Sequence, residues 1–142
     1  KIIFLYTGNS CRSQMEEGFT RHTVGNEESL IESAGVRADG MNPIAVKVME
    51  EVGVDITTQT SKKISSINLN LFDIIVTVCE HARETCPIVL HKKIIHKKIV
   101  DPETIGGTED EKLLMYRQVR NEIRGIIINL LNNYDSICQE RN

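Results

Sequence analysis

KIIFLYTGNSCR, residues 1–12, decides the fold of this chain, because it predicts a buried strand that runs directly into a tight turn and a helix. The apolar, partly β-branched run Ile2–Tyr6 is typical of a buried strand, and Thr7–Ser10 is typical of a turn. A turn at the positive end of a helix dipole points backbone N–H groups at a ligand, and Arg12 can add a bidentate fork. These residues indicate a site for a phosphate-like anion, although by themselves they also fit a plain strand-to-helix turn.

The composition is that of an ordinary globular chain. Its 142 residues, 40% hydrophobic and 26% charged, suit one domain spanning residues 1–142. A net charge of -3 gives no reason to expect binding to nucleic acid or to a membrane. With no apolar run of membrane length and no signal-peptide pattern, we expect a cytoplasmic protein. In that compartment the four cysteines are more often catalytic, redox-active or buried than paired in structural disulfides.

Strand-like and helix-like segments alternate along the chain. The predicted strands are residues 2–6, 29–34, 73–78 and, more weakly, 94–100. The predicted helices are residues 15–24, 42–52 and 108–134. The second helix begins at an Asn-Pro pair, and the third begins at Thr108 with Glu111 three residues on, as in a capping box. This order predicts an α/β fold: an open four-stranded parallel sheet with helices on both faces.

Chemically useful residues follow three of the predicted strands. The Tyr6–Arg12 loop, Cys79 and the Asp101–Pro102 pair each come directly after a strand. In open parallel sheets ligands bind at the carboxyl ends of the strands. We therefore expect these residues to converge on one crevice.

Taken together, these motifs resemble those of the thioredoxin-coupled arsenate reductases. The resemblance is carried by Thr7–Met15, Ser33–Gly35, Cys79, Cys86, Asp101–Pro102 and Gly107–Glu109, and it covers nearly the whole chain. It implies the low-molecular-weight protein tyrosine phosphatase fold. It also implies that the oxyanion is bound by Thr7, Gly8, Asn9, Ser10, Cys11, Arg12 and Ser13. Simple phosphatases of this fold do not need the segment 79–87, which favours the reductase branch.

The resemblance implies a relay of three thiols. In the family a loop thiolate attacks arsenate, a second thiol releases arsenite by forming a disulfide with the first, and a third thiol takes over that disulfide. Cys79 matches the second thiol and Cys86 the third, so these two would form the redox disulfide that a thioredoxin-like protein reduces. Without the neighbouring loop, both cysteines would more simply be small buried hydrophobes.

Tyr6 stands where the family has its first thiol, six residues before the loop arginine. A phenol has an ordinary pKa of about 10, so only roughly a thousandth would be ionised at neutral pH. A phenolate could take up arsenate, but no Tyr–S bond can follow, and the relay stops at its second step. The bulky ring could block or reshape the pocket as readily as provide a new nucleophile.

Two other cysteines and one acid complete the set of candidates. Cys11 precedes Arg12 near a helix N-terminus, where a thiolate is favoured, so it is a possible substitute nucleophile; in the family this position does not point at the anion, and a packing role is the simpler interpretation. Cys138 matches no motif. By resemblance Asp101 is the general acid that protonates the leaving oxygen, although an Asp before Pro also commonly starts a plain loop.

No metal or other cofactor is expected. Asn9, Ser13, Glu17 and Ser33 match positions that order the loop or bind a monovalent cation in some family members. The acid expected among the cation ligands is replaced near Lys62, whose ammonium could stand in for the ion. No Cys/His spacing resembles a zinc site.

The main functional hypothesis is an arsenate reductase homologue with an incomplete relay. A pseudoenzyme that binds phosphate or arsenate, or that acts as a dithiol redox protein, is the alternative, and a phosphatase-like hydrolase is a further one. The expected partners are the oxyanion and a thioredoxin-like reductant, with no nucleic acid and no membrane, and we expect a monomer.

Overall fold

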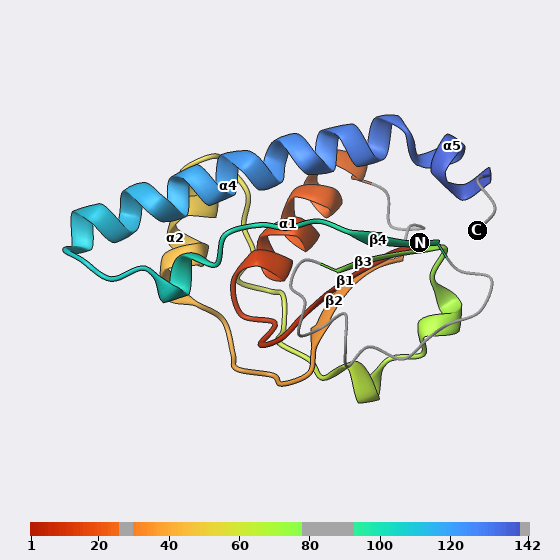
Figure 1. Cartoon of the computed structure of the whole chain (residues 1–142), viewed down its shortest axis with the longest axis horizontal. Coiled ribbons are helices and arrows are strands. Elements are labelled where there is room, and N and C mark those ends of the chain that lie inside the picture. Colours follow the sequence, from red (N-terminus) through yellow and green to blue (C-terminus); the bar gives the residue numbers. More distant parts are fainter. Residues whose placement is uncertain (26–29, 78–92, 140–142) are drawn as a thin grey trace.

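Four parallel strands form the centre of the molecule (Figure 1). The computed structural model describes residues 1–25, 30–77 and 93–139. The strands are β1 (Ile2–Tyr6), β2 (Ile31–Gly35), β3 (Ile74–Thr77) and β4 (Lys93–His96), in the order β2-β1-β3-β4. Each neighbouring pair is parallel. The predicted four-stranded parallel sheet is therefore confirmed.

The two faces of the sheet are covered differently. The α-helices α1 (Arg12–Val24), α2 (Pro43–Glu50) and α4 (Glu109–Asn132) pack on one face, against alternate β1 residues that include Phe4 and Tyr6. On the other face, Ile3 and Leu5 pack against the short 3-10 helices η1 (Ile64–Ser66) and η2 (Leu69–Leu71) and their flanks. Burial on both faces explains why β1 is apolar throughout.

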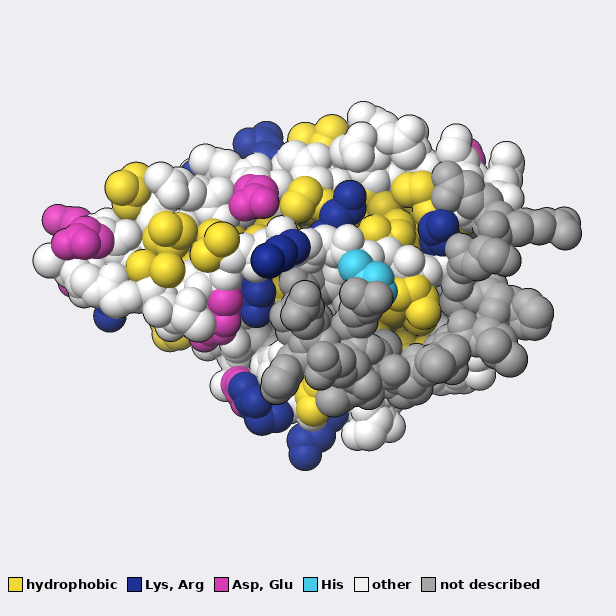
Figure 2. All heavy atoms as spheres, viewed as in Figure 1, with side chains coloured by type: hydrophobic (Ala, Val, Ile, Leu, Met, Phe, Trp, Pro, Cys, Tyr) yellow, Lys and Arg dark blue, Asp and Glu magenta, His cyan; other side chains and the backbone are white. Residues whose placement is uncertain are grey.

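The predicted starts of the second and third helices are confirmed by their caps. Asn42 Oδ1 accepts hydrogen bonds from the N–H groups of Ile44 at 2.9 Å and Ala45 at 3.2 Å. Thr108 Oγ1 accepts from Glu111 N at 3.2 Å, and three acidic residues in the first turn of α4 suit its positive end. In Figure 2 acidic side chains gather at the left end of the molecule, where α4 begins.

Several element boundaries differ from the predictions, among them the start of α1, which lies at Arg12 and not at residue 15. Helix α2 ends at Glu50 because Val52 N and Gly53 N donate to carbonyls only three residues back. The last helix divides at Asn133, whose side-chain amide donates to Asn129 O at 2.8 Å, and α5 (Tyr134–Gln139) follows. Strand β4 ends at His96 instead of residue 100, and the chain after it turns toward α1, where Ile99 O accepts from Arg12 at 2.9 Å. Within the described residues, no helix combines the length and the apolar character needed to cross a bilayer.

Candidate active site

The loop between β1 and α1 lies where ligands are expected in this kind of sheet. In the order β2-β1-β3-β4, the strand that follows β1 in the chain lies on one side of it, and β3 and β4 lie on the other. The carboxyl end of β1 is therefore a switch point, where ligands bind in such sheets. Residues 7–11 occupy this position, and α1 begins at Arg12.

The carbonyl oxygens of this loop are all used by the surrounding chain. Backbone N–H groups from residues 36–42 donate to Tyr6 O, Thr7 O, Gly8 O and Ser10 O at distances between 2.8 and 3.2 Å. The amide of Gln14 donates to Asn9 O at 3.0 Å, and Met15 N donates to Cys11 O at 2.9 Å. Because these acceptors are held by the scaffold, we expect the N–H groups at the start of α1 to be the backbone groups that a ligand meets, and these suit an anion.

Asn9 holds the loop in an unusual backbone conformation. Its φ of 51° lies in the left-handed region, which Asn tolerates better than most residues. The buried side chain donates to Ser13 Oγ at 2.7 Å and Ser33 Oγ at 2.9 Å, and it accepts from Lys62 N at 2.7 Å. Asn9 thereby ties the loop to α1, to β2 and to the segment before η1.

The loop encloses a pocket of about 360 Å³. It is lined by residues 6–13 together with Arg37, Asp39, Asp101 and Glu103. All seven residues predicted to bind the oxyanion, together with Tyr6 and Asp101, are therefore brought together. The three acids of the lining each have a partner: Asp39 lies 3.1 Å from Arg37, Asp101 lies 3.5 Å from Arg12, and Glu103 accepts from Ser10 at 2.9 Å.

Arg12 is engaged by the chain on both sides of its guanidinium. Nη1 donates to Ile99 O at 2.9 Å, and Nη2 lies 3.5 Å from Asp101 Oδ2. The guanidinium carbon also lies 4.9 Å from the centroid of the Tyr6 ring, which is a cation–π distance. An anion in the pocket would compete with Asp101 for Arg12.

Tyr6 is turned into the core instead of offering its hydroxyl to the pocket. Only 2% of the residue is exposed, and its hydroxyl donates to Glu16 Oε1 at 2.5 Å. Burial, and next the Glu16 carboxyl, raise the pKa of the Tyr6 phenol well above its ordinary value. A phenolate nucleophile at neutral pH is therefore not available in this arrangement.

Glu16 is a fully buried acid on α1. Burial raises its pKa to about 8, although the hydrogen bond from Tyr6 and the charge of Arg12 act in the opposite direction. Its second oxygen, Oε2, has no hydrogen-bond partner among the described residues. Burying a carboxyl oxygen without a hydrogen-bond partner lowers the free energy of unfolding, and the hydrogen bond from Tyr6 offsets part of this loss at Glu16.

Cys11 does not replace the missing thiolate in this geometry. It is the residue before α1, is buried, and packs within the core beside α1 and α4. Burial, followed by the nearby Glu103 and Asp101 carboxylates, raises the pKa of its thiol. The packing interpretation agrees with this position. Cys138 is exposed on α5.

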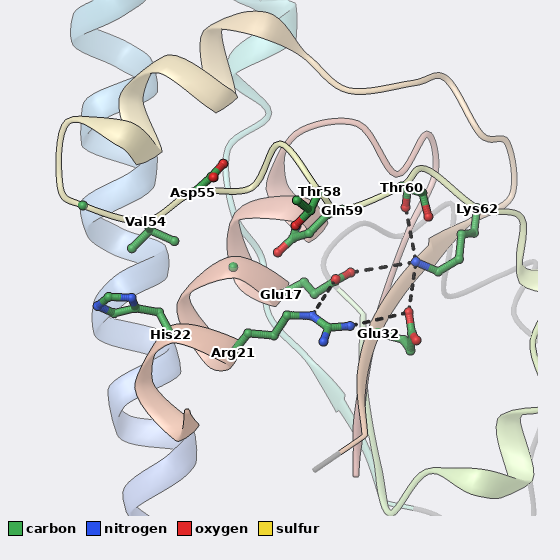
Figure 3. Close-up of a pocket in the computed structure, with 12 residues that line it drawn as sticks. Glu17, Arg21, His22, Glu32, Val54, Asp55, Thr58, Gln59, Thr60 and Lys62 are labelled. Atoms are coloured by element: carbon green, nitrogen blue, oxygen red, sulfur yellow. Dashed lines mark hydrogen bonds and ion pairs between the residues drawn. The ribbon is translucent and has the colours of Figure 1, made fainter. Parts of the chain in front are cut away.

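Lys62 reaches a second pocket of about 600 Å³ beside the loop (Figure 3). Its ammonium lies 3.0 Å from Glu32 Oε2 and 4.0 Å from Glu17 Oε1, and Arg21 approaches the same two carboxylates. Ser33 Oγ donates to Glu17 Oε1 at 2.6 Å, which links this cluster to Asn9. The four residues expected to order the loop are thus brought together, with two side-chain cations beside them. No group of metal-binding side chains was found in the described part of the chain.

Comparison with known families identifies this arrangement. The model of the family "Low molecular weight phosphotyrosine protein phosphatase" matches residues 1–141. The chain belongs to this family.

Arsenate reductases are among the proteins of this family that the chain is similar to. The arsenate reductase of Bacillus subtilis is 49% identical over 123 residues, which is 86% of this chain and 88% of that protein. The arsenate reductase of Oceanobacillus iheyensis is 48% identical over 123 residues, again 86% of this chain and 88% of that protein. A solved arsenate reductase in the oxidized state superposes with a TM-score of 0.79 at 30% identity, covering 93% of this chain and 96% of that one. The chain is therefore an arsenate reductase homologue.

Four members of the site were missed by the sequence predictions for this homologue. Arg37, Asp39 and Glu103 line the pocket, and Glu16 holds Tyr6. A signal for Glu16 existed, because it lies between Met15 and Phe19 on the core-facing side of α1, where an acid needs a partner. Cys79 and Cys86, the predicted redox pair, lie outside the described residues.

Proposed function

We propose that this arsenate reductase homologue keeps the oxyanion site of its relatives but lacks the first step of their thiol relay. The observation that carries the proposal is the contrast between the intact loop and the residue at its base. Residues 7–12 form a donor-lined pocket with Arg12, whereas position 6 holds a phenol that is committed to Glu16. One similar solved protein, at 30% identity and a TM-score of 0.74 over 93% of this chain and 96% of its own, is an arsenate reductase in the phosphate binding state.

The number of electrons that the reaction needs shows why the step is missing. Reduction of arsenate to arsenite takes up two electrons, which the relay obtains by converting two thiols into one disulfide. With Tyr6 in place of the first thiol, a sulfur atom is lacking at the point where arsenate is bound. Cys79 and Cys86 would still supply a dithiol that a thioredoxin-like protein could reduce, and Asp101, next to Arg12, would still be placed to protonate a leaving oxygen.

The alternatives are less well supported. A phosphatase-like hydrolase needs the same nucleophile at position 6, so it meets the same gap. A binding or dithiol redox protein would need no first thiol, but the curated relatives at 48–49% identity are named for arsenate reduction. A cytoplasmic location and a monomeric state belong to the same proposal.

Oxyanion binding is tested by titration calorimetry with inorganic phosphate. We expect the unaltered chain to bind, and Arg12→Ala to weaken binding by about tenfold or more, because a charge-assisted bidentate contact is lost. Arg124→Ala, which removes the same charge from the exposed face of α4, is the matched control and should bind like the unaltered chain. No binding by the unaltered chain at millimolar phosphate would refute an intact site.

The gap in the relay is tested by turnover. Arsenate-dependent NADPH oxidation, coupled through thioredoxin and thioredoxin reductase, is measured for the unaltered chain and for Tyr6→Cys. We expect activity only in Tyr6→Cys. Equal activity in both proteins would show that the chain reduces arsenate by another route.

A further inference from the structure

The contact between Tyr6 and Glu16 joins the end of β1 to the second turn of α1. The Tyr6 hydroxyl donates to Glu16 Oε1 at 2.5 Å, and both side chains are buried. Glu16 is 0% exposed and does not line the oxyanion pocket, whereas Tyr6 forms part of its wall. The phenol therefore crosses from the pocket wall to an acceptor within the core.

The pocket borders Tyr6 and is the other place where its hydroxyl could find a partner. Tyr6 ends a strand whose carboxyl edge opens into the pocket, and the pocket offers polar surroundings to a phenol hydroxyl. In the observed placement the hydroxyl is cut off from water, so it needs an acceptor in the core. Glu16 Oε1 is that acceptor, and Arg12 covers the ring from the pocket side at 4.9 Å.

Resting on the proposed oxyanion site, we propose that Glu16 is a positioning residue that holds the Tyr6 ring out of the pocket and so keeps the pocket open for an anion. The same contact explains how the carboxyl of Glu16 can be buried. With Tyr6 as donor, one carboxyl oxygen is paired and only Oε2 remains without a partner among the described residues. Without Glu16, the Tyr6 hydroxyl would have no acceptor in the core. The ring would then turn into the pocket, where its hydroxyl can be hydrogen-bonded, and would occupy the space that phosphate needs.

The position of the ring is measured without any ligand. Tyr6 is nitrated with tetranitromethane and quantified by peptide mass mapping. The internal reference is Tyr116, whose hydroxyl oxygen accepts a hydrogen bond from Asn42 Nδ2 at 3.0 Å. We expect Glu16→Ala to raise the nitration rate of Tyr6 about tenfold relative to Tyr116, a factor that matches loss of one good hydrogen bond. Glu16→Gln keeps an acceptor oxygen and should leave the rate near that of the unaltered chain. Equal rates in all three proteins would overturn the proposal.

The consequence for the pocket is measured by phosphate calorimetry in two backgrounds. Glu16→Ala should weaken phosphate binding about tenfold when Tyr6 is present, because only the molecules with the ring in the core can bind. In a Tyr6→Phe background, where no hydroxyl needs the acceptor, the same change should have less than about a twofold effect. A loss of equal size in both backgrounds would mean that Glu16 acts only as general support for the fold, and the proposal would be wrong.

These outcomes separate the positioning role from the oxyanion site. If the unaltered chain binds no phosphate, the proposed function fails, and nitration alone still decides the role of Glu16. If Glu16→Ala does not fold, Glu16→Met provides an apolar side chain of similar length without an acceptor for the hydroxyl, and the same nitration result is expected of it.

Discussion

The guanidinium carbon of Arg12 lies 4.9 Å from the centroid of the Tyr6 ring, so the arginine predicted to bind the anion packs on the residue at the predicted nucleophile position. The same guanidinium reaches Ile99 O and Asp101. A change at position 6 therefore removes a surface that supports Arg12, as well as altering the chemistry at the base of the loop. Substitutions of Tyr6 are therefore expected to change the position of Arg12 as well.

The stability of the chain should depend on positions 6 and 16 together. Tyr6→Cys removes a buried ring and leaves the Glu16 carboxyl without its donor. We expect Glu16→Met to raise the free energy of unfolding by about 1–3 kcal/mol more in Tyr6→Cys than in the unaltered chain, since only there is the carboxyl wholly unpaired. Urea denaturation of the four proteins measures this coupling. Additive effects would show that the two side chains do not interact.

Acidic conditions should stabilise the folded chain through Glu16. The folded pKa of about 8 lies above the ordinary value of 4.5, so between these values the folded state holds a proton that the unfolded state has released. The free energy of unfolding should therefore fall as the pH rises from about 4.5 to about 8, by up to about 1.4 kcal/mol per pH unit from this group. Urea denaturation across this pH range should show a shallower dependence in Glu16→Gln. Glu122→Gln, the same change at an exposed position, is the control and should keep the slope.

Alkylation should distinguish the two described cysteines. Cys11 is buried and its thiol pKa is raised, whereas Cys138 is exposed. With iodoacetamide at a pH of about 8, we expect Cys138 to react at least about a hundredfold faster than Cys11, as mapped by peptide mass spectrometry. Comparable rates would reopen Cys11 as a substitute nucleophile.

Gly35 should not tolerate a side chain. A Cβ atom there would lie 2.7 Å from Thr7 O and 2.9 Å from Asn9 N, both backbone atoms of the oxyanion loop. Gly35→Ala is therefore expected to lower the free energy of unfolding by about 1–3 kcal/mol. Gly125→Ala, inside α4 with nothing within 4 Å of the new atom, is the contrasting case and should raise it by about 0.5–1 kcal/mol. Chemical denaturation of both variants provides the comparison, and a neutral Gly35→Ala would contradict the close approach of β2 to the loop.

Local pattern was sufficient for most of the fold. Apolar runs, Asn42, Thr108 and Gly8 lie close in sequence to the structures that they define, so strands, caps and the turn could be predicted from neighbouring residues. Boundaries that depend on distant partners could not. Strand β4 ends early where Ile99 O accepts from Arg12, 87 residues away, and no local pattern encodes that contact.

The sequence by itself determined that a strand ends in a turn before a helix and that position 6 is a tyrosine. Its resemblance to the family predicted that this turn is the oxyanion site and that Tyr6 stands in place of the first thiol. Only the tertiary structure decided what that phenol does. Its partner, Glu16, is ten residues away on α1, and the pair meets because strand and helix pack face to face. Burial then sets the outcome. A hydroxyl and a carboxyl removed from water must satisfy each other, which directs Tyr6 into the core, and the removal from water itself raises the pKa of both groups.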